Sequence, residues 1–394
     1  APVIVVVGIG ADGMDGLAGV SKRELRNATV IYGSARQLDL LDETVTAARR
    51  NWPSPMMPEL RRLVDSGTDD IHVVASGDPL LHGIGATLIR MCGADRVRVL
   101  PHVSSATLAC ARLGWAAQDT EVISLVNSPV HLAVRSGGRA VVLSRDGGTP
   151  SALARQLCES GRGATEFTVL EQLGGADERI RSATADGWAA VCPGDVDDLN
   201  VIAVRYLPDE RFGHVLPDDA FRHDGQITKQ MIRSVTVTAL GPRPGEMLWD
   251  VGSGSGSIAV EWCRSGNGCG AVAFESDPGR RDRIGDNARA FGVEFAIRGE
   301  APACFDGLGA PDVVFVGGGL TKPGLLSACI DRLKPGGRMV VNAVTAESGA
   351  VRVEWQGRSG GELRRFQHYR GEPLGDFTTW RPQLPITQWS VVVS

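Results

Sequence analysis

The chain has 394 residues, a formal net charge of −5 and 50 glycines, and 43% of its residues are hydrophobic. That hydrophobic content supports sizeable cores and excludes a disordered chain. No apolar run approaches the roughly 18 residues that span a membrane, and neither half has the basic excess of a nucleic-acid binder. No secretory signal is recognisable around the first apolar run, Val3–Val7. We therefore expect a soluble cytoplasmic protein that binds neither membranes nor nucleic acid.

The cysteines and histidines give no sign of a metal site. The eight cysteines are scattered without a CxxC pair, and the seven histidines show no HxxH or HExxH spacing. Spacings of these kinds are typical of protein zinc sites. We expect free thiols in a reducing compartment and no protein-bound metal.

The first half of the sequence alternates short apolar runs with helical patterns, divided by glycine and proline. The predicted strands are Val3–Val7, Thr29–Tyr32, Ile71–Ala75, Val97–Leu100, Glu121–Val126, Ala140–Leu143, Glu166–Leu170 and Val201–Arg205. The predicted helices are Arg36–Leu41, Glu59–Ser66, Ile84–Cys92, Ser105–Leu113 and Ser151–Ser160. Strands that alternate with helices predict an α/β architecture.

A polar, proline-containing segment, residues 208–222, interrupts this pattern and is typical of a linker. Beyond it a helical stretch, Thr228–Leu240, leads into a second alternating series, with a further helix at Ile258–Arg264. The strands predicted there are Met247–Val251, Ala271–Glu275, Val293–Arg298, Val313–Val316, Arg338–Asn342, Glu362–Tyr369 and Trp389–Val393. The sequence thus predicts two α/β domains, 1–207 and 223–394.

A glycine-rich loop, DVGSGSGS (250–257), lies between the first strand and the next helix of the second domain. Its GxGxG spacing, with an acid two residues before it, is that of class I methyltransferases, which use S-adenosylmethionine (SAM). Bare glycine backbone lets a ligand approach closely, and an acid at the end of the second strand is placed to accept hydrogen bonds from ribose hydroxyls. The predicted cofactor contacts here are Asp250, Gly252, Ser253, Gly254, Ser255, Gly256 and Glu275.

Two later segments complete the predicted cofactor site. Glu300 and Ala301 follow a predicted strand and are placed to contact adenine, and Gly317 begins three glycines at another strand end, where a planar ligand can lie close. A dinucleotide fingerprint would need its third glycine at position 257, which is serine. A nicotinamide oxidoreductase is therefore the minor alternative.

The first domain carries a glycine loop of its own, with Gly8 and Gly10 directly after the first strand. A GDPxxxG element that begins at Gly77 and Asp78 follows another strand, and a PxxSS element with Ser104 and Ser105 precedes a helix. Each element alone is also compatible with a plain turn. Together they resemble the tetrapyrrole methyltransferases, a structurally distinct class of SAM enzymes, and those six residues are the predicted cofactor contacts.

Over nearly its full length the sequence resembles one family, the fused precorrin-6Y C-methyltransferases (decarboxylating) of cobalamin biosynthesis. The motifs that carry this resemblance include GDPLLHGIG (77–85), PHVSS (101–105), LEQLGGADERI (170–180), HDGQITKQMIR (223–233) and LWDVGSGSGSIAVEW (248–262). The resemblance implies an N-terminal tetrapyrrole-methyltransferase fold of two α/β subdomains and a C-terminal class I Rossmann-like domain. It also implies SAM as the methyl donor, an anionic precorrin as the substrate and a homo-oligomer.

The resemblance further implies a division of labour. The first domain would methylate carbon 5 of the macrocycle, and the second would methylate carbon 15 and decarboxylate the acetate on ring C. Two alternatives stay open at this point. The chain could methylate another small molecule, or the first domain could serve only as a substrate platform, because Ala11 and Asp12 stand where many tetrapyrrole methyltransferases carry Pro-Gly.

A substrate with several carboxylates favours cationic residues around each cleft. Lys229 and Arg233, on the helix after Gly225, are the candidates in the second domain, although a solvated helix face would give the same pattern. Glu261, in the helix after the glycine loop, is either catalytic or structural. Thr228 would contact SAM by analogy with the family. Weaker carboxylate-binding candidates in the first domain are Arg112, Arg145 and Arg179.

Overall fold

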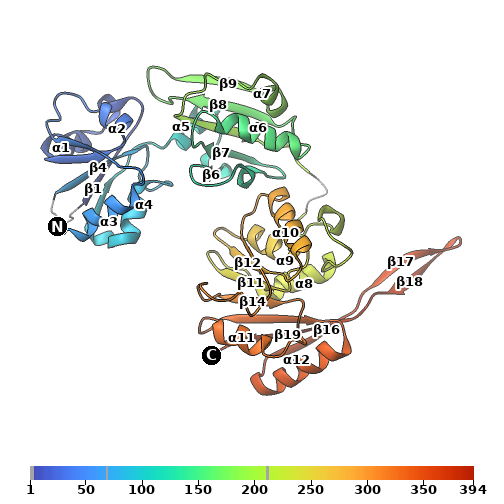
Figure 1. Cartoon of the computed structure of the whole chain (residues 1–394). Coiled ribbons are helices and arrows are strands. Elements are labelled where there is room, and N and C mark those ends of the chain that lie inside the picture. Colours follow the sequence, from blue (N-terminus) through green and yellow to red (C-terminus); the bar gives the residue numbers. More distant parts are fainter. Residues whose placement is uncertain (1–3, 68–69, 210–212) are drawn as a thin grey trace. The chain divides into compact units, whose positions relative to one another are not determined.

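The computed structural model describes residues 4–67, 70–209 and 213–394. The chain divides into two compact units, Ala1–Pro208 and Asp209–Ser394, each with its own sheets and hydrophobic clusters (Figure 1). Both units are α/β structures, so the predicted fold class is confirmed.

The first unit begins with a parallel five-stranded sheet in the order β3-β2-β4-β1-β5. Its strands are β1 (Ile4–Ile9), β2 (Val30–Gly33), β3 (Ala48–Asn51), β4 (Ile71–Ser76) and β5 (Val97–Leu100). Its helices are η1 (Gly13–Gly16), α1 (Gly19–Asn27), α2 (Ala35–Asp39), α3 (Met57–Asp65), α4 (Ile84–Cys92) and η2 (Ala94–Arg96). Every residue of β1 is buried, as expected for a parallel strand covered on both faces.

The second sheet of this unit has the order β6-β7-β10-β8-β9, with β6 parallel to β7 and the other neighbours antiparallel. Its strands are β6 (Glu121–Ser124), β7 (Arg139–Leu143), β8 (Glu166–Glu171), β9 (Arg179–Thr184) and β10 (Asn200–Arg205). Its helices are α5 (Ser105–Leu113), η3 (Ala117–Asp119), η4 (Val130–Ala133), α6 (Thr149–Glu159) and α7 (Ala185–Val191). The helices cover both faces: Ala109 of α5 packs with Val141, and Leu153 of α6 packs with Val142.

The second unit is built on one seven-stranded sheet in the order β13-β12-β11-β14-β15-β19-β16. The first five strands are parallel, and β19 and β16 are antiparallel additions at one edge. These strands are β11 (Met247–Val251), β12 (Gly270–Phe274), β13 (Ala296–Arg298), β14 (Val313–Val316), β15 (Arg338–Ala343), β16 (Glu362–Phe366) and β19 (Ile386–Val392). The strand order reverses between β11 and β14, which is where ligands bind in open α/β sheets.

Helices cover both faces of this sheet. They are η5 (Asp218–Ala220), α8 (Gln230–Leu240), α9 (Ser257–Arg264), α10 (Pro278–Ala290), α11 (Leu325–Arg332) and α12 (Ala346–Ser359). Residues of α8 and α9 pack with Phe315 and Val340, whereas residues of α11 and α12 pack with Val341 and Trp389. Val340 and Val341 are neighbours in β15 but face opposite sides of the sheet, which is the period-two pattern of a strand that is buried on both faces.

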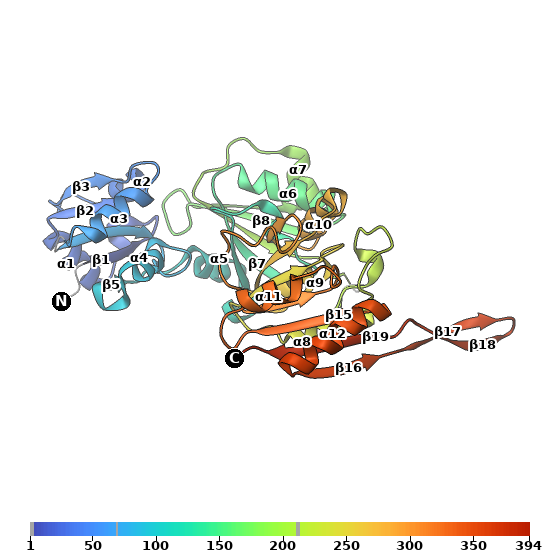
Figure 2. The same ribbon diagram turned by 60° about the horizontal axis from the view of Figure 1, so that its bottom comes forward.

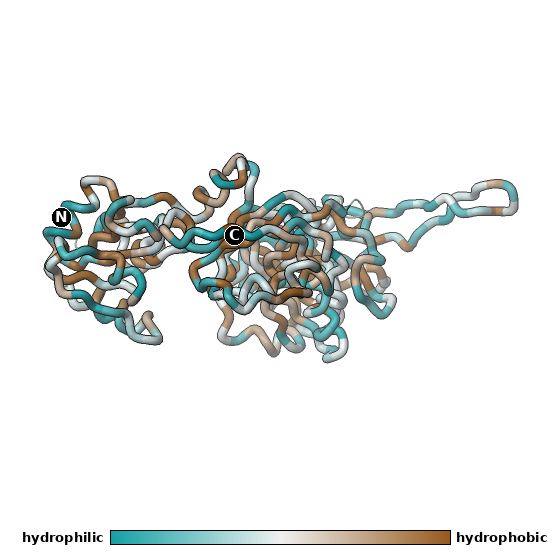
Figure 3. Tube along the Cα trace, turned by 90° about the horizontal axis from the view of Figure 1, so that it is seen from above, coloured by the Kyte–Doolittle hydropathy of each residue, from teal (hydrophilic) through white to brown (hydrophobic). Residues whose placement is uncertain are grey.

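A two-stranded hairpin, β17 (Tyr369–Leu374) and β18 (Phe377–Pro382), projects from the second unit. Figures 1 and 2 show it extending away from the seven-stranded sheet in both views. Figure 3 shows it as mostly hydrophilic, whereas hydrophobic residues concentrate within the body of the unit. Phe377 and Trp380 are nevertheless largely exposed on it. We call this hairpin the arm.

The structure corrects several predicted boundaries. The strand predicted at Val293–Arg298 spans only Ala296–Arg298, and the one predicted at Glu362–Tyr369 splits into β16 and the start of β17. The helix predicted from Thr228 starts at Gln230, so Lys229 lies in the loop before α8 rather than on the helix. Val3, predicted to start the first strand, lies outside the described residues.

The segment predicted as a linker, 208–222, does more than connect the two units. The boundary between the units falls at Pro208 and Asp209. Leu216 and Phe221 are buried in the second unit, where they pack with Val260 of α9. Much of the predicted linker therefore belongs to the core of the second unit, because these two apolar side chains gain free energy by leaving water.

Candidate functional site

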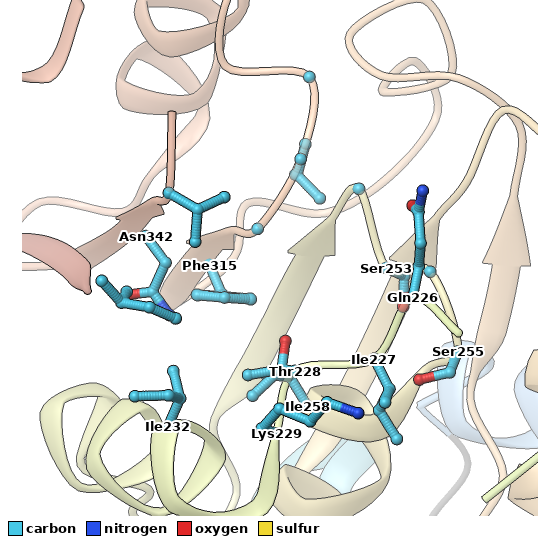
Figure 4. A pocket seen from close by; sticks show the side chains of 18 of the residues that line it. Gln226, Ile227, Thr228, Lys229, Ile232, Ser253, Ser255, Ile258, Phe315 and Asn342 are labelled. Carbon is cyan, nitrogen blue, oxygen red and sulfur yellow. The ribbon is translucent and has the colours of Figure 1, made fainter. Parts of the chain in front are cut away.

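A cavity of about 1050 Å³ opens at the carboxyl ends of the parallel strands of the second unit. The loops after β11, β12 and β14 line it, together with the segment before α8 and the base of the arm. Figure 4 shows Asn342 and Phe315 at one side of this cavity and Ser253 and Ser255 at the other. The cavity thus lies at the reversal of strand order, where the sequence places its glycine loop.

The glycines at 252, 254 and 256 all have positive φ angles, of 70°, 61° and 77°. L-amino acids with side chains rarely adopt this conformation. A Cβ atom on Gly252 would lie 2.7 Å from the backbone of Gly318, and one on Gly256 would lie 2.8 Å from the side chain of Ile284. These two glycines therefore shape the loop and its packing. At Gly254 the nearest atom to a Cβ would be 3.8 Å away, so this glycine has space beside it.

Asp250, in strand β11, holds the glycine loop in place through hydrogen bonds. Its Oδ2 accepts hydrogen bonds from the Ser253 hydroxyl at 2.7 Å and the Ala259 amide at 3.2 Å, while its Oδ1 is buried and has no partner among the described residues. The hydroxyl of Ser255, on the cavity wall, is also buried and unpartnered within the described part of the chain. Unpartnered buried polar atoms are costly, so the Ser255 hydroxyl on the cavity wall is placed to bond a polar ligand.

Replacing Asp250 with Asn should make the stability of the second unit less dependent on pH. Burial raises the pKa of Asp250 to about 6 from its ordinary value of 3.8. The folded chain then holds this proton more tightly than the unfolded chain, so stability falls as pH rises from about 4 to about 6, by up to roughly 3 kcal/mol. Asn keeps the oxygen that accepts from Ser253 and Ala259 and does not titrate.

Urea unfolding of both chains across this pH range checks the prediction. The free energy of unfolding of the wild type, minus that of the variant, should fall with rising pH and then level off. The matching substitution of Asp306, an exposed carboxylate, serves as the control and should leave the pH profile unchanged. A difference that stays flat would show that folding does not raise the pKa of Asp250.

Glu275, at the end of β12, joins the glycine loop to the next strand. Its Oε2 accepts from the Gly254 amide at 2.9 Å, and its Oε1 accepts from the Asp277 amide at 3.0 Å. The side chain is nearly buried but lines the cavity. A carboxylate has about four lone-pair sites, so Glu275 retains capacity to accept from a ligand.

Most of the other predicted residues of this unit also line the cavity: Thr228, Lys229, Gly252, Ser253, Gly254, Ser255, Glu300, Ala301 and Gly317. Asp250 and Gly256 lie behind the loop and do not line it. The Glu300 carboxylate pairs with Lys322 at 2.7 Å. The sequence-predicted set is therefore brought together at one edge of the sheet.

Arg233 and Glu261 do not face the cavity. The Arg233 side chain is fully buried, and its guanidinium lies 3.3 Å from the Glu261 carboxylate and 3.2 Å from that of Asp218. It also donates to the backbone oxygens of Thr228 and Leu216. The expectation that Arg233 meets the substrate is wrong, because every side of its guanidinium is occupied by the protein. Glu261 does not line the cavity either, and its carboxylate pairs with Arg233 and Arg264, which favours the structural one of its two predicted roles.

Several cavity residues were not identified from the sequence. Arg280 and Lys322 add positive charge, paired with Asp224 and Glu300 respectively. Arg370, from the base of the arm, lines the cavity, and its side chain makes no hydrogen bond or ion pair with another described residue. Asn342, near the end of β15, lies on the same wall. The only local signal for Lys322 is its position shortly after the three glycines, and nothing near Arg370 or Asn342 in the sequence marks them.

In the first unit the predicted glycines serve close backbone packing. A Cβ atom on Gly8 would lie 2.1 Å from the Gly77 carbonyl oxygen, and one on Gly10 would lie 2.9 Å from the His102 imidazole. The Gly77 amide donates to the Ile9 carbonyl at 2.9 Å. These contacts bring the loops after β1, β4 and β5 together at the carboxyl edge of the parallel sheet.

The polar residues predicted at the same edge have local partners. Ser104 caps α5 by accepting from the Thr107 amide at 3.1 Å, and Ser105 is the first residue of that helix. The Asp78 carboxylate accepts from the Leu80 amide at 2.9 Å. The three weaker arginine candidates are also engaged by the protein: Arg112 with Glu178, Arg179 with Glu171 and Asp195, and Arg145 with backbone oxygens of Val126 and Ser128.

The remaining expectations concern metals, membranes and thiols. Within the described ranges, no three or more histidine, cysteine or acidic side chains gather as metal ligands would. None of the helices there combines the length and apolarity needed to cross a bilayer. All eight cysteines are free thiols.

Two family models match the chain, one on each unit. The model of tetrapyrrole (corrin/porphyrin) methylases matches residues 3–187, and that of the precorrin methyltransferase domain matches residues 219–393. The chain therefore combines two different methyltransferase domains, as its two folds and the cavity of the second unit indicate.

Curated relatives match at the level of the whole chain. The precorrin-6Y C(5,15)-methyltransferase (decarboxylating) of Mycobacterium tuberculosis strain CDC 1551 / Oshkosh is 64% identical over 389 residues, 99% of each chain. The protein of the same name from Sinorhizobium sp is 43% identical over 99% of this chain and 96% of its own. A probable cobalt-precorrin-6B C(15)-methyltransferase (decarboxylating) of Pyrobaculum calidifontis is 34% identical over 43% of this chain and 92% of its own.

The chain belongs to the family of the precorrin-6Y C(5,15)-methyltransferases (decarboxylating) of cobalamin biosynthesis. It is a decarboxylating methyltransferase. The family predicted from the sequence motifs is therefore confirmed.

Proposed function

We propose that this chain transfers methyl groups from SAM to the two meso carbons, 5 and 15, of a precorrin and removes the acetate carboxyl of ring C. The first unit methylates carbon 5, and the second unit methylates carbon 15 and decarboxylates. The observation that carries the proposal for the second unit is one cavity with a glycine loop, Glu275 and the Ser255 hydroxyl at one side and Arg370 at its rim. Among the described residues, neither that hydroxyl nor the Arg370 guanidinium has a partner.

The loop side of the cavity fits SAM. Glu275 accepts a hydrogen bond from the Gly254 amide and has further lone pairs that can accept from ribose hydroxyls. The Ser255 hydroxyl has no hydrogen-bond partner among the described residues and can bond the ligand. Gly254 leaves space for the ligand. When bound, SAM supplies an electrophilic methyl group on a sulfonium. The protein contributes mainly by aligning this group with the meso carbon, which is a proximity effect.

The remaining wall of the cavity suits a large anionic macrocycle. Lys229 is mostly exposed and lies 4.0 Å from Asp218, a separation that leaves it able to meet a second anion. Arg370 offers a planar guanidinium that matches carboxylate geometry. The apolar side chains of Ile232, Phe315 and Leu384 line the same cavity and can pack on the face of the ring.

In the first unit, Gly8, Gly10, Gly77, Asp78, Ser104 and Ser105 are the proposed SAM contacts. Support comes from their common position at the carboxyl edge of the parallel sheet. By resemblance to the family, the proposal includes a homo-oligomer that works in the cytoplasm. The alternative for the first unit, a substrate platform without methyl transfer, predicts that no methyl group reaches carbon 5.

Replacing Glu275 with Gln in the full-length chain tests the assignment of the second unit. Gln keeps the size of the side chain but places an NH₂ group where a carboxylate oxygen accepts, so we expect SAM affinity at this site to fall about tenfold or more. Calorimetric titration measures the affinity. With a reduced precorrin and SAM below the weakened Kd, mass spectrometry should show a slower gain of the second methyl group than in the wild type.

Glu354, an exposed residue of α12 paired with Arg358, provides the matched control, and its Gln variant should behave as the wild type. Wild-type SAM affinity in the Glu275 variant, or a wild-type rate of the second methyl gain at limiting SAM, would contradict the assignment. Absence of any turnover of a precorrin by the wild type would contradict the proposed function itself.

A further inference from the structure

A chain of three polar side chains ends at the cavity wall. Asn342 donates through Nδ2 to the Thr236 hydroxyl at 2.9 Å, and its Oδ1 accepts from Nε2 of Gln388 at 3.0 Å. Thr236 and Gln388 are almost completely buried, whereas Asn342 lines the cavity. The three residues come from α8, β15 and β19, so the fold fixes the position of the Asn342 amide from two sides.

The direction of these hydrogen bonds is set by a backbone carbonyl. The Thr236 hydroxyl donates its single proton to the Ile232 carbonyl oxygen at 2.7 Å within α8. The hydroxyl can then only accept from Asn342. The group of Asn342 that faces Thr236 is therefore NH₂, and its oxygen faces Gln388.

One N–H of Asn342 remains after these bonds are counted. An amide NH₂ has two protons, and no second acceptor for this group exists among the described residues. Figure 4 shows Asn342 next to Phe315, and both line the cavity together with Ile232. Asn342 therefore offers a neutral donor beside the apolar side chains of Phe315 and Ile232, two strands from the glycine loop.

We propose that Asn342 is a positioning residue that donates this N–H to the acetate carboxylate that the substrate loses. The inference rests on the proposed function. A neutral donor orients a carboxylate without neutralising its charge, whereas a bound lysine or arginine would stabilise the carboxylate and oppose the loss of carbon dioxide. The apolar neighbours keep the carboxylate poorly solvated, which favours the same step. The electron pair released from the broken C–C bond passes into the conjugated macrocycle, which takes up a proton.

Two substitutions of Asn342 test the proposal in the full-length chain with a reduced precorrin and SAM. Asn342→Leu removes the donor, and kcat/KM for decarboxylation should fall at least tenfold. Asn342→Asp places a carboxylate against the substrate carboxylate. At neutral pH its kcat/KM for decarboxylation should therefore fall further than that of Asn342→Leu. Below the pKa of this new side chain the protonated acid has one proton, for which Thr236 and the substrate carboxylate compete, so activity relative to wild type should recover in part.

A pair of threonines on α8 gives the matched control. Thr236 and Thr238 both bond the carbonyl oxygen four residues earlier, but only Thr236 also holds Asn342. Thr236→Val should lower decarboxylation several-fold, and Thr238→Val should not. SAM affinity measured by calorimetry should be unchanged in every variant, which shows that the cavity is intact.

Two results would overturn the inference: wild-type decarboxylation by Asn342→Leu, or an Asn342→Asp variant whose relative activity does not rise as pH falls. Failure of the wild type to turn over any precorrin would instead contradict the proposed function. The two failures are therefore distinguishable.

Discussion

Replacing Gly252 with alanine should abolish SAM binding to the second unit and lower its stability by roughly 3–5 kcal/mol. The residue has a φ of 70°, which costs an alanine about 1–2 kcal/mol. The added Cβ would also lie 2.7 Å from the Gly318 backbone. That backbone cannot rotate away as a side chain would, so the loops after β11 and β14 must separate. Thermal unfolding and calorimetric titration with SAM measure the two effects.

Alanine variants of two other glycines show how much of the destabilisation comes from the positive φ angle alone, without the steric overlap. Gly307 has a φ of 77° and no described atom within 4 Å of where a Cβ would lie, and Gly254 has a φ of 61° with its nearest atom at 3.8 Å. Their alanine variants should lose only the cost of the backbone conformation, about 1–2 kcal/mol. A Gly252 variant no less stable than the Gly307 variant would show that the contact with Gly318 is unimportant.

Replacing Arg233 with leucine should destabilise the second unit by about 3–5 kcal/mol, the range for breaking a buried ion pair by removing one partner. The substitution removes the buried cation beside Glu261, whose carboxylate is 2% exposed, and leaves the carbonyl oxygens of Thr228 and Leu216 without their donor. Arg264 also pairs with Glu261 but at the surface. Its leucine variant should cost far less, since water can replace a partly exposed partner.

Circular dichroism melts of both variants measure this difference. An Arg233 variant that unfolds as the wild type does, but loses affinity for the precorrin, would restore the role that the sequence suggested for it. The structure gives a reason for expecting the opposite. Arg233 joins α8 to the segment around Leu216, and it holds the backbone at Thr228, which lines the cavity.

Local sequence patterns predict the buried parts of this fold well and its exposed parts poorly. Strands such as β11 and β14 are continuous apolar runs, and their boundaries were predicted to the residue. Helix α10 buries only Ile284, Asn287 and Ala288 among many arginines, so it has almost no apolar period. The sequence patterns therefore did not predict α10. They did not predict strand β3 either, which is exposed along its length and lies at a sheet edge.

The same distinction applies to the candidate site. The glycine loop and Glu275 are identifiable because backbone conformation and strand ends are local properties of the chain. The roles of Arg233 and Asn342 depend on partners that are distant in the sequence. Arg233 lies 28 residues from Glu261, and Asn342 lies 106 residues from Thr236. No spacing rule connects such pairs, so charge alone suggested a surface role for an arginine that is in fact buried.

The arm has a thermodynamic consequence for substrate affinity. It is a two-stranded ribbon that pairs with no third strand in the described part of the chain, and such a ribbon is marginally stable in water. Yet Tyr369 and Arg370 at its base form part of the cavity wall. Any ligand that contacts these residues must also hold the ribbon in order, so binding and local folding are linked equilibria. Part of the interaction free energy is spent on this ordering, and substitutions at the distant tip can therefore change affinity without touching the ligand.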